Sequence, residues 1–412
     1  MLFLYDLGIQ LYRFLILLAA LKNKKAAAWI KGRTDILNHI ASQVKSSQNR
    51  IWFHFASLGE FEQGRPVLEE IKSRYPEMSI VITFFSPSGF EVRKDYKLAD
   101  YVFYLPLDTP KNARVFVRLI KPSIAVFTKY EYWYHYFESL HANNIPLFIV
   151  SGLFRKDQPF FRWYGGLHRK MLSRVTHFFV QNQLSYSLLG NLGFKNASVT
   201  GDTRFDRVLK NASQVSRIPA VQKFCGDSKV FIAGSTWPED EKILAPLARN
   251  FPAWKFIIAP HEVDPTHIRA IEQLFINSVK LSSVKQSTVE PQVLIIDNIG
   301  MLSSLYQYGN VAYVGGGFGV GIHNTQEAAA YGLPVIFGPN YHNFQEAIDL
   351  VEAGPSYSIK DFDELSRRMD YLENEEIRSE LGAAAKQYVL KKAGASTIIV
   401  NYLEENNLIN RF

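Results

Sequence analysis

Short apolar runs alternate with helix-periodic stretches along the chain from residue 51 onward. Helical periodicity predicts helices at residues 67–74, 111–120, 133–143, 160–172 and 183–192, between predicted strands. Strands that alternate with helices are typical of a parallel sheet covered on both faces. The predicted strands are IWFHFAS (51–57), SIVITFF (79–85), YVFYLP (101–106), SIAVFTK (123–129), PLFIV (146–150) and HFFVQ (177–181), with residues 198–202 closing this first domain.

A second series of the same kind occupies the back half. Its predicted strands are VFIAG (230–234), WKFIIAP (254–260), VLIID (293–297), VAYVG (311–315) and PVIFG (334–338). Its predicted helices are 239–250, 267–275, 300–308, 326–331 and 344–353, followed by a helical tail over 362–406. The pattern therefore predicts an α/β protein with two doubly wound, Rossmann-like domains.

Residues 203–227 are polar and contain Pro219, so we interpret them as an irregular connection between the domains. The predicted organisation is an N-terminal membrane-associated helix with its basic flank (1–33), a first domain (34–205), a linker (206–227), a second domain (228–390) and a C-terminal helical tail (391–412).

Residues 2–21 are strongly apolar but include Asp6, Gln10 and Arg13. A signal peptide would place its basic residues before the apolar run, whereas here Lys22, Lys24, Lys25, Lys31 and Arg33 follow it. The segment is long enough to span a bilayer, and its internal charges fit a helix in the membrane interface equally well. A third alternative is an amphipathic helix docked on the globular body. Either membrane arrangement leaves the body in the cytoplasm by the positive-inside rule.

Composition narrows the classes of partner. The chain has 412 residues, 47% of them apolar and 21% charged, which is typical of a globular protein. The single cysteine, Cys225, excludes an internal disulfide and fits a reducing compartment. A net charge of +7 suggests an acidic partner. Because no nucleic-acid-binding motif is present, we favour an anionic lipid or a phosphorylated substrate over nucleic acid.

The most suggestive stretch follows the predicted strand at 311–315. Its glycines allow a tight turn and close approach of a ligand, and Asn324 then opens a helix. A strand, a glycine loop and a helix start together predict an anion site, because free backbone N–H groups point out of the helix end. Glycine-rich turns that bind nothing are also common, and Asn324 with Glu327 fits an ordinary N-cap.

In the first domain, the main candidate is Glu60, at the turn between the first strand and the following helix. Ligands bind at the carboxyl ends of strands in such folds, and a carboxylate there can accept a proton from an attacking hydroxyl. The alternative is structural, because Ser57-x-x-Glu60 has capping-box spacing. Glu62 is the competing carboxylate.

Several motifs in order resemble one family. They are HFASLGE (54–60), TKYEYW (128–133), IPLFIVSG (145–152), VTGDTRFD (199–206), GSTWPEDE (234–241), APHE (259–262) and the glycine-rich stretch that continues to residue 347. Together they resemble 3-deoxy-D-manno-octulosonic acid (Kdo) transferases, GT-B glycosyltransferases that attach Kdo to lipid A precursors. The resemblance covers nearly the whole chain and implies a GT-B fold, with the two domains facing across a cleft.

The resemblance also implies residue roles. Glu60 matches the general base, Glu131 a carboxylate that supports the transition state, and Arg204 a basic residue that is commonly lysine. Glu327 matches the carboxylate that holds the ribose hydroxyls of the donor. The implied CMP-binding residues are Pro260 and His261, where the family's intervening arginine is missing, then Ile299, Gly300 and Met301, and then Asn324, Thr325, Gln326 and Glu327.

The implied donor is CMP-Kdo, and a helix N-terminus with Arg204 would supply positive potential for its phosphate without a metal. The only Asp-x-Asp pattern, Asp361 to Asp363, is predicted to be a helix N-cap. His54 is predicted to be packed or hydrogen-bonded in the core. His261 and His323 are candidates for donor contact.

These inferences predict an inverting Kdo transferase of lipopolysaccharide biosynthesis. Its partners would be CMP-Kdo, a phosphorylated lipid A precursor and an anionic membrane, with no nucleic acid and no cofactor. It would act at the cytoplasmic face of the cell inner membrane. The alternatives are another GT-B enzyme that uses a UDP-sugar, either a transferase or an epimerase, and a membrane-bound scaffold that has lost catalysis.

Overall fold

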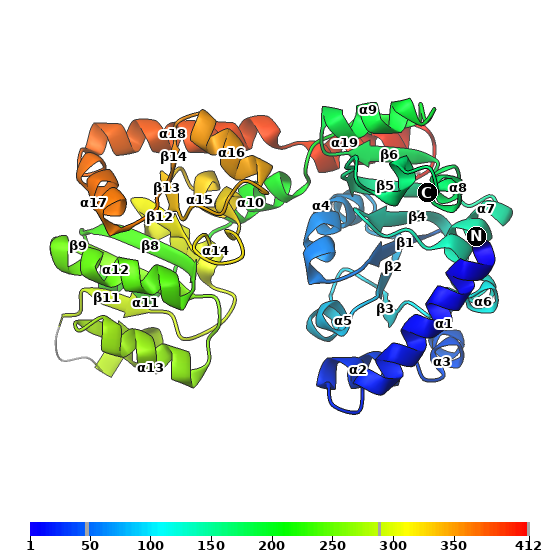
Figure 1. The fold of residues 1–412 in the computed structure, drawn as a ribbon, viewed down its shortest axis with the longest axis horizontal. Coiled ribbons are helices and arrows are strands. Elements are labelled where there is room, and N and C mark those ends of the chain that lie inside the picture. The colour runs from blue at the N-terminus through cyan, green and yellow to red at the C-terminus, as the bar shows by residue number, and fades with distance from the viewer. Residues whose placement is uncertain (46–48, 287–289, 410–412) are drawn as a thin grey trace. The chain divides into compact units, whose positions relative to one another are not determined.

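The computed structural model describes residues 1–45, 49–286 and 290–409. The chain divides into two compact units, shown in Figure 1. Unit 1 comprises Met1–Asp206 together with Gly394–Phe412, and unit 2 comprises Arg207–Ala393. Each unit has its own parallel sheet, as the alternation of strands and helices predicts.

Unit 1 is built on a seven-stranded sheet in the order β3-β2-β1-β4-β5-β6-β7. All of its neighbouring strands are parallel, and central strand β1 pairs with β2 on one side and β4 on the other. The strands are β1 (Arg50–Phe55), β2 (Ser79–Phe84), β3 (Tyr101–Tyr104), β4 (Pro122–Thr128), β5 (Leu147–Gly152), β6 (His177–Val180) and β7 (Ala197–Val199).

Alternating side chains of β1 supply two cores, one on each face of this sheet. Phe53 and its face pack against helices α4 (Leu58–Arg74) and α19 (Ala395–Glu405). Trp52 and the opposite face pack against α6 (Pro110–Ile120) and α7 (Tyr134–Ala142). The remaining helices of unit 1 after the first are α2 (Lys24–Lys31), α3 (Ile36–Gln43), α5 (Pro87–Arg93), α8 (Gly166–Leu172) and α9 (Gln183–Asn191).

The first helix, α1 (Leu2–Ala19), is docked on unit 1 along one face. Ile9 is buried beside Trp29, the Tyr5 hydroxyl donates to Asp108, and Asp6 pairs with His135 at 2.6 Å. Its other faces remain exposed and apolar. By length and composition alone, α1 is also sufficient to cross a membrane. The exposed apolar residues include Phe3, Leu4, Leu7, Leu11, Phe14, Leu15 and Leu18.

Unit 2 has a second seven-stranded parallel sheet, in the order β10-β11-β9-β8-β12-β13-β14. Apolar cores line both of its faces. The strands are β8 (Lys229–Thr236), β9 (Trp254–Pro260), β10 (Ser278–Lys280), β11 (Val293–Ile295), β12 (Val311–Val314), β13 (Val335–Phe337) and β14 (Ser356–Ser358). The α-helices described in unit 2 after residue 226 are α12 (Pro238–Asn250), α13 (Pro265–Leu274), α14 (Leu302–Leu305), α15 (Thr325–Ala330), α16 (Gln345–Glu352), α17 (Phe362–Tyr371) and α18 (Glu375–Lys392).

The structure corrects the irregular connection predicted over 203–227. Helices α10 (Arg204–Ser213) and α11 (Pro219–Cys225) form there instead. Pro219 occupies the first turn of α11, where its missing N–H would have no helical partner, so it begins the helix rather than breaking it. The other predicted segment boundaries stay predictions.

Three predicted helices have different extents. The helix predicted at 67–74 begins at Leu58, because Ser57 caps it and Phe61 anchors its first turns ahead of Pro66. The helix predicted at 160–172 is a 3-10 turn at Pro159–Phe161 followed by α8. The helix predicted at 300–308 is α14 followed by a 3-10 turn at Tyr306–Tyr308.

The C-terminal segment, predicted as a separate tail, belongs to unit 1 through α19. Asp206 binds the start of this helix, accepting hydrogen bonds from the Gly394 amide and from both the amide (2.7 Å) and hydroxyl (2.6 Å) of Ser396. A carboxylate at a helix N-terminus also complements the helix dipole. Asp206, the last residue of the VTGDTRFD motif, therefore holds the start of α19 by hydrogen bonds.

Candidate active site

The candidate site in unit 1 lies at the carboxyl ends of β1 and β4. These two strands are neighbours, and β2 and β5 continue the sheet in opposite directions from them. Such a reversal of strand order is where open α/β sheets bind ligands. Glu60 follows β1 in the first turn of α4, and Glu131 follows β4.

Glu60 is half-buried and is held by its own helix start. Ser57 is the N-cap of α4, and its Oγ accepts a hydrogen bond from the Gly59 amide at 3.2 Å. The same hydroxyl donates its proton to Glu60 Oε2. The predicted capping role therefore holds for Ser57, and it presents Glu60 as a hydrogen-bonded carboxylate.

Glu131 is fixed by two ring N–H groups. Trp133 Nε1 donates to Glu131 Oε2 at 2.8 Å, and His54 Nε2 lies 3.1 Å from the same oxygen. His54 is fully buried, and its Nδ1 lies 2.9 Å from Thr83 Oγ1, which also accepts from Trp52 Nε1 at 2.7 Å. Because the carboxylate can only accept, we assign the proton of a neutral His54 to Nε2, with Nδ1 accepting from Thr83. His54 is hydrogen-bonded in the core as predicted, and it also orients Glu131.

Lys129 is influenced electrostatically by both Glu60 and Arg204. Arg204 is held by the buried Asp202, whose Oδ2 lies 2.8 Å from Nε and 2.7 Å from a terminal guanidinium nitrogen. Burial lowers the pKa of Lys129, as does the charge of Arg204, whereas Asp202 and Glu60 raise it. Glu60, Lys129 and Arg204 therefore share one electrostatic neighbourhood. Lys129 also has a left-handed backbone, with φ of 62°, which is unusual for a residue with a side chain.

The candidate site in unit 2 lies at the equivalent reversal, between neighbouring strands β8 and β12. The glycine loop after β12 is attached to the start of α12 by Asp240. This buried carboxylate accepts from the Gly316 amide (2.9 Å), the Tyr313 hydroxyl (2.7 Å) and the Trp237 amide (2.9 Å). Burial raises the pKa of Asp240, and these hydrogen bonds oppose the shift.

The first glycines of this loop permit close approach of main-chain segments. A Cβ on Gly315 would lie 2.3 Å from the Ser235 carbonyl oxygen, and one on Gly317 would lie 2.6 Å from the Gly338 backbone. Gly316 has φ of 91°, a conformation that glycine adopts without steric cost. Part of the glycine pattern therefore serves packing within unit 2.

Three aromatic rings stack beside this loop. The Trp237 and His261 ring centroids are 4.9 Å apart, and those of His261 and His323 are 4.3 Å apart, with interplanar angles of 26° and 20°. Trp237 Nε1 donates to His323 Nε2 at 3.0 Å. Burial lowers the pKa of His323 to about 4, and the charge of His261 contributes to this shift. His323 is therefore neutral near pH 7, with its proton on Nδ1.

The start of α15 brings together the last group of predicted residues. Asn324 is its N-cap, as predicted, accepting from the Gln326 amide at 3.0 Å and donating to Glu327 Oε1 at 3.3 Å. Burial raises the pKa of Glu327, and the charge of Arg207 opposes that shift. In the described part of the chain, neither amide atom of the buried Gln326 has a hydrogen-bond partner, nor has the Thr325 hydroxyl. Such orphaned polar atoms mark a place where a ligand or water belongs.

The remaining predicted residues lie at two other strand ends. Pro260 ends β9, and His261 follows it into the ring stack. Ile299, Gly300 and Met301 form the loop before α14, where Ile299 is exposed and Met301 is the N-cap residue. Gly300 has φ of 91°.

Comparisons with known proteins show similarity to one family. The sequence profile described as "3-Deoxy-D-manno-octulosonic-acid transferase (kdotransferase)" matches residues 30–207. A 3-deoxy-D-manno-octulosonic acid transferase of Haemophilus influenzae is 28% identical over 380 residues, covering 86% of this chain and 88% of that protein. Residues 30–207 thus match the Kdo transferase family model, and most of the chain is similar to curated Kdo transferases.

Solved structures support the GT-B fold of this protein. A UDP-GlcNAc 2-epimerase from Neisseria meningitidis aligns with a TM-score of 0.64 at 18% identity, covering 86% of this chain and all of that one. MurG from Acinetobacter baumannii aligns with a TM-score of 0.55 at 11% identity, covering 87% and 99%. These likenesses concern the fold alone. The exposed apolar helix α1 is consistent with membrane association.

Some features of the candidate sites do not follow from the sequence alone. Lys129 lies within the TKYEYW motif, but the motif alone does not predict a role for it. Its electrostatic interaction with Glu60 depends on the position of β4 beside β1. Trp237 and Asp240 lie within GSTWPEDE, where acidic residues after a proline indicate only a helix start. Asp240 contacts Gly316, 76 residues away, and Trp237 contacts His323, 86 residues away, so no local sequence pattern predicts these contacts.

The Asp-x-Asp pattern has the predicted capping role. Asp361 is the N-cap of α17 and accepts from the Glu364 amide at 2.8 Å. Across residues 1–45, 49–286 and 290–409, no three His, Cys, Asp or Glu side chains are grouped so that they could hold a metal ion.

Proposed function

We propose that this protein transfers Kdo from CMP-Kdo to a hydroxyl of a phosphorylated lipid A precursor, with inversion, in lipopolysaccharide biosynthesis. One observation carries this proposal. Glu60 is a half-buried, hydrogen-bonded carboxylate at the strand-order reversal of unit 1, in the electrostatic neighbourhood of Lys129 and Arg204. A base at a ligand-binding edge, beside cations suited to a phosphorylated acceptor, is what such a transfer requires.

In the proposed reaction, Glu60 takes the proton of the acceptor hydroxyl. The oxygen attacks the anomeric carbon of Kdo, the bond from that carbon to the CMP phosphate oxygen breaks, and CMP leaves with the bonding electron pair. The Ser57 hydroxyl holds Glu60 in place by donating a hydrogen bond to its Oε2. Glu131, oriented by His54 and Trp133, contributes negative charge near the positive charge that develops on the sugar.

We assign donor binding to unit 2. Glu327 and Asn324 would hold the ribose hydroxyls, with Gln326 and Thr325 supplying the buried polar atoms that have no partner within the described chain. Pro260 and His261 would contact the nucleotide, and so would Ile299, Gly300 and Met301. The flat stack of His261 and His323 offers an aromatic surface suited to a pyrimidine ring.

The proposed charge stabilisation uses protein groups alone. The start of α15 and Arg204 would balance the phosphate of the leaving CMP without a metal ion or other cofactor. We place the enzyme at the cytoplasmic face of the inner membrane, because the basic residues Lys22, Lys24 and Lys25 follow the apolar helix.

The function is tested by incubating the purified full chain with CMP-Kdo and a tetraacylated lipid A precursor, then identifying products by mass spectrometry. We expect CMP and a Kdo-bearing lipid in equal amounts. Release of CMP without the modified lipid would contradict the proposal.

Competition identifies the donor class. We expect CMP, and not UDP, to inhibit the transfer. Inhibition by UDP instead would indicate a UDP-sugar enzyme of the same fold. Binding of the lipid with no binding of either nucleotide would indicate a scaffold without catalysis.

A further inference from the structure

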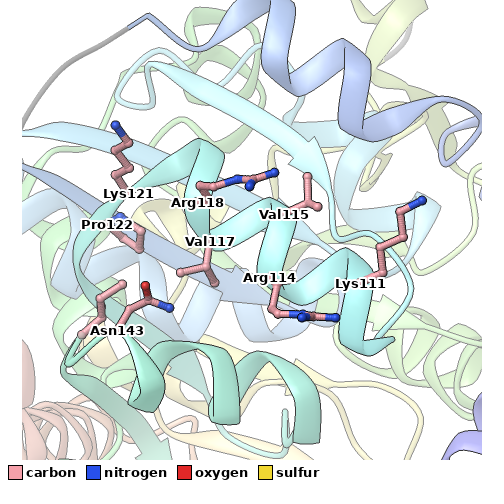
Figure 2. A pocket seen from close by; sticks show the side chains of 9 residues that line it. Lys111, Arg114, Val115, Val117, Arg118, Lys121, Pro122 and Asn143 are labelled. Carbon is pink, nitrogen blue, oxygen red and sulfur yellow. The ribbon is translucent and has the colours of Figure 1, made fainter.

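Helix α6 carries a row of exposed cations on the surface of unit 1. Lys111, Arg114 and Arg118 follow one another at helical spacings of three and four residues, and Lys121 follows at the C-cap. The opposite side of the helix, including Phe116 and Ile120, is buried in the core. Figure 2 shows these four side chains extending from α6 and its C-cap around a hollow that Asn143 also lines. We call these four residues the α6 cations.

Among the described residues of unit 1, the α6 cations have no anionic partner. Across the described residues, no ion pair joins any of them to a carboxylate, and only Arg114 makes a side-chain hydrogen bond, donating to the Pro110 carbonyl at 3.1 Å. The hollow has a volume of about 710 Å³, and none of the described residues that line it is acidic. Four close cations without counter-charges repel one another in the isolated protein, so an anion bound there would relieve this repulsion.

The α6 cations are continuous with the apolar helix α1. A second hollow of about 740 Å³ is lined jointly by Arg13 and Leu17 of α1 and by Lys111 and Val115 of α6. Its one acidic lining residue, Asp35, accepts a hydrogen bond from Asn38. One surface of unit 1 therefore combines exposed leucine and phenylalanine side chains on α1 with a cationic helix beside them.

We propose that the α6 cations bind the phosphates of anionic phospholipid headgroups when the exposed face of α1 enters the membrane interface. Two weak signals are needed for stable attachment to a membrane, an apolar one and an electrostatic one. Helix α1 supplies the apolar contribution. Its one internal cation, Arg13, supplies little of the electrostatic contribution. The α6 cations would also fix the rotation of unit 1 about α1, because they lie to one side of that helix.

Vesicle flotation tests this proposal without requiring enzymatic activity. The full chain is compared with a quadruple variant, Lys111→Gln, Arg114→Gln, Arg118→Gln and Lys121→Gln, on phosphatidylcholine vesicles with and without phosphatidylglycerol. Each lysine or arginine near an anionic surface contributes about fivefold in affinity. We therefore expect the variant to lose at least about tenfold in affinity for the anionic vesicles, and to bind pure phosphatidylcholine like the wild type.

The matched control removes four exposed cations from unit 2, by Lys242→Gln, Arg249→Gln, Lys360→Gln and Lys391→Gln. It has the same net charge as the first variant, and we expect it to keep wild-type binding. Equal losses of affinity for anionic vesicles in the two variants would show that only net charge matters, and would overturn the proposal. A conservative variant, Arg114→Lys with Arg118→Lys, should bind normally, since lipid phosphates require charge rather than a fixed fork of donors. Circular dichroism confirms that each variant is folded.

Two further outcomes would assign the α6 cations to a different ligand. If inorganic phosphate displaced the protein from anionic vesicles much more strongly than chloride at equal ionic strength, the residues would form a site for free phosphate. If the quadruple variant kept its membrane affinity but lost binding to RNA, the surface would serve nucleic acid. Either result contradicts the proposal.

Discussion

At the scale of single residues, the candidate site depends on side chains that hold other side chains. Glu131 is oriented by His54 and Trp133, and Arg204 by Asp202. In unit 2, Asp240 holds the glycine loop in the same way. Because a buried polar group without its partner costs about 1–3 kcal/mol, these supporting residues make the geometry of the site sensitive to substitutions near it.

Trp133→Phe tests the support of Glu131. The substitution keeps an aromatic ring against Phe85 but removes the indole N–H that donates to Glu131. A hydrogen bond to a charged group contributes about 1.5–3 kcal/mol, and His54 remains in place, so we expect kcat to fall by about tenfold. Trp163→Phe is the control, because Trp163 is 91% exposed on a loop. Equal kcat values in the two variants would show that this hydrogen bond does not matter.

His177 makes the stability of unit 1 depend on pH. Burial against Phe179 and Tyr402 lowers its pKa to about 4, whereas an unfolded histidine titrates near pH 6.5. The unfolded chain therefore binds more protons between these values, so the stabilisation is complete above about pH 6.5 and is lost as pH falls toward 4. His177 alone would remove up to about 3 kcal/mol over this interval.

Urea unfolding at several pH values measures this effect. We expect the free energy of unfolding of His177→Phe to depend less on pH between 6.5 and 4 than that of the wild type. Phenylalanine keeps the packed ring and does not titrate. His141→Gln, at an exposed position, should retain the wild-type slope. A variant at position 177 that is as acid-sensitive as the wild type would disprove the role of this residue.

At the scale of elements, the strands were the most predictable feature. Apolar runs such as IWFHFAS and WKFIIAP correspond to β1 and β9, because a strand buried on both faces cannot be polar. Edge strands β10 and β14 were missed, since SVK and SYS are too short and too polar to show that pattern. Helix α4 was placed too late, because Pro66 resembles a first-turn proline although it lies inside the helix.

The glycine loop allows a matched test at this scale. A methyl group on Gly317 would lie 2.6 Å from the Gly338 backbone, whereas one on Gly319 would come no closer than 3.6 Å to the Gly316 carbonyl oxygen. Backbone cannot move aside as a side chain can. We therefore expect Gly317→Ala to destabilise unit 2 by about 2–4 kcal/mol and Gly319→Ala to be nearly neutral. Thermal unfolding checks this difference, and equal melting temperatures would contradict it.

At the scale of the whole molecule, the chain uses both of its ends to complete unit 1. The N-terminal helix α1 packs on a small core that includes Trp133, the residue that donates to Glu131. The C-terminal helix α19 covers one face of the sheet and is held at its start by Asp206. The surface that we propose meets the membrane is thus joined through Trp133 to a candidate catalytic carboxylate.

The sequence could predict the fold class and the two sheets because periodicity is a local property. The interactions of the candidate site could be predicted only where both hydrogen-bonding residues lie in the same motif, as do Asn324 and Glu327 or Ser57 and Glu60. The electrostatic influence of Glu60 on Lys129 and the hydrogen bond between Trp237 and His323 depend on which strands are neighbours, and no single segment of the sequence determines the strand order.

The central claim is that Glu60 removes the proton from the acceptor hydroxyl. Single-turnover formation of the Kdo-bearing lipid should be compared for the wild type, Glu60→Gln and Glu62→Gln. Glu62 is on the same helix but pairs with Arg93 at 3.0 Å, so it serves as the matched control. We predict that Glu60→Gln slows the transfer by about 10²–10⁴-fold while CMP-Kdo still binds, and that Glu62→Gln remains within a few fold of the wild type. Undiminished transfer by Glu60→Gln would contradict the account.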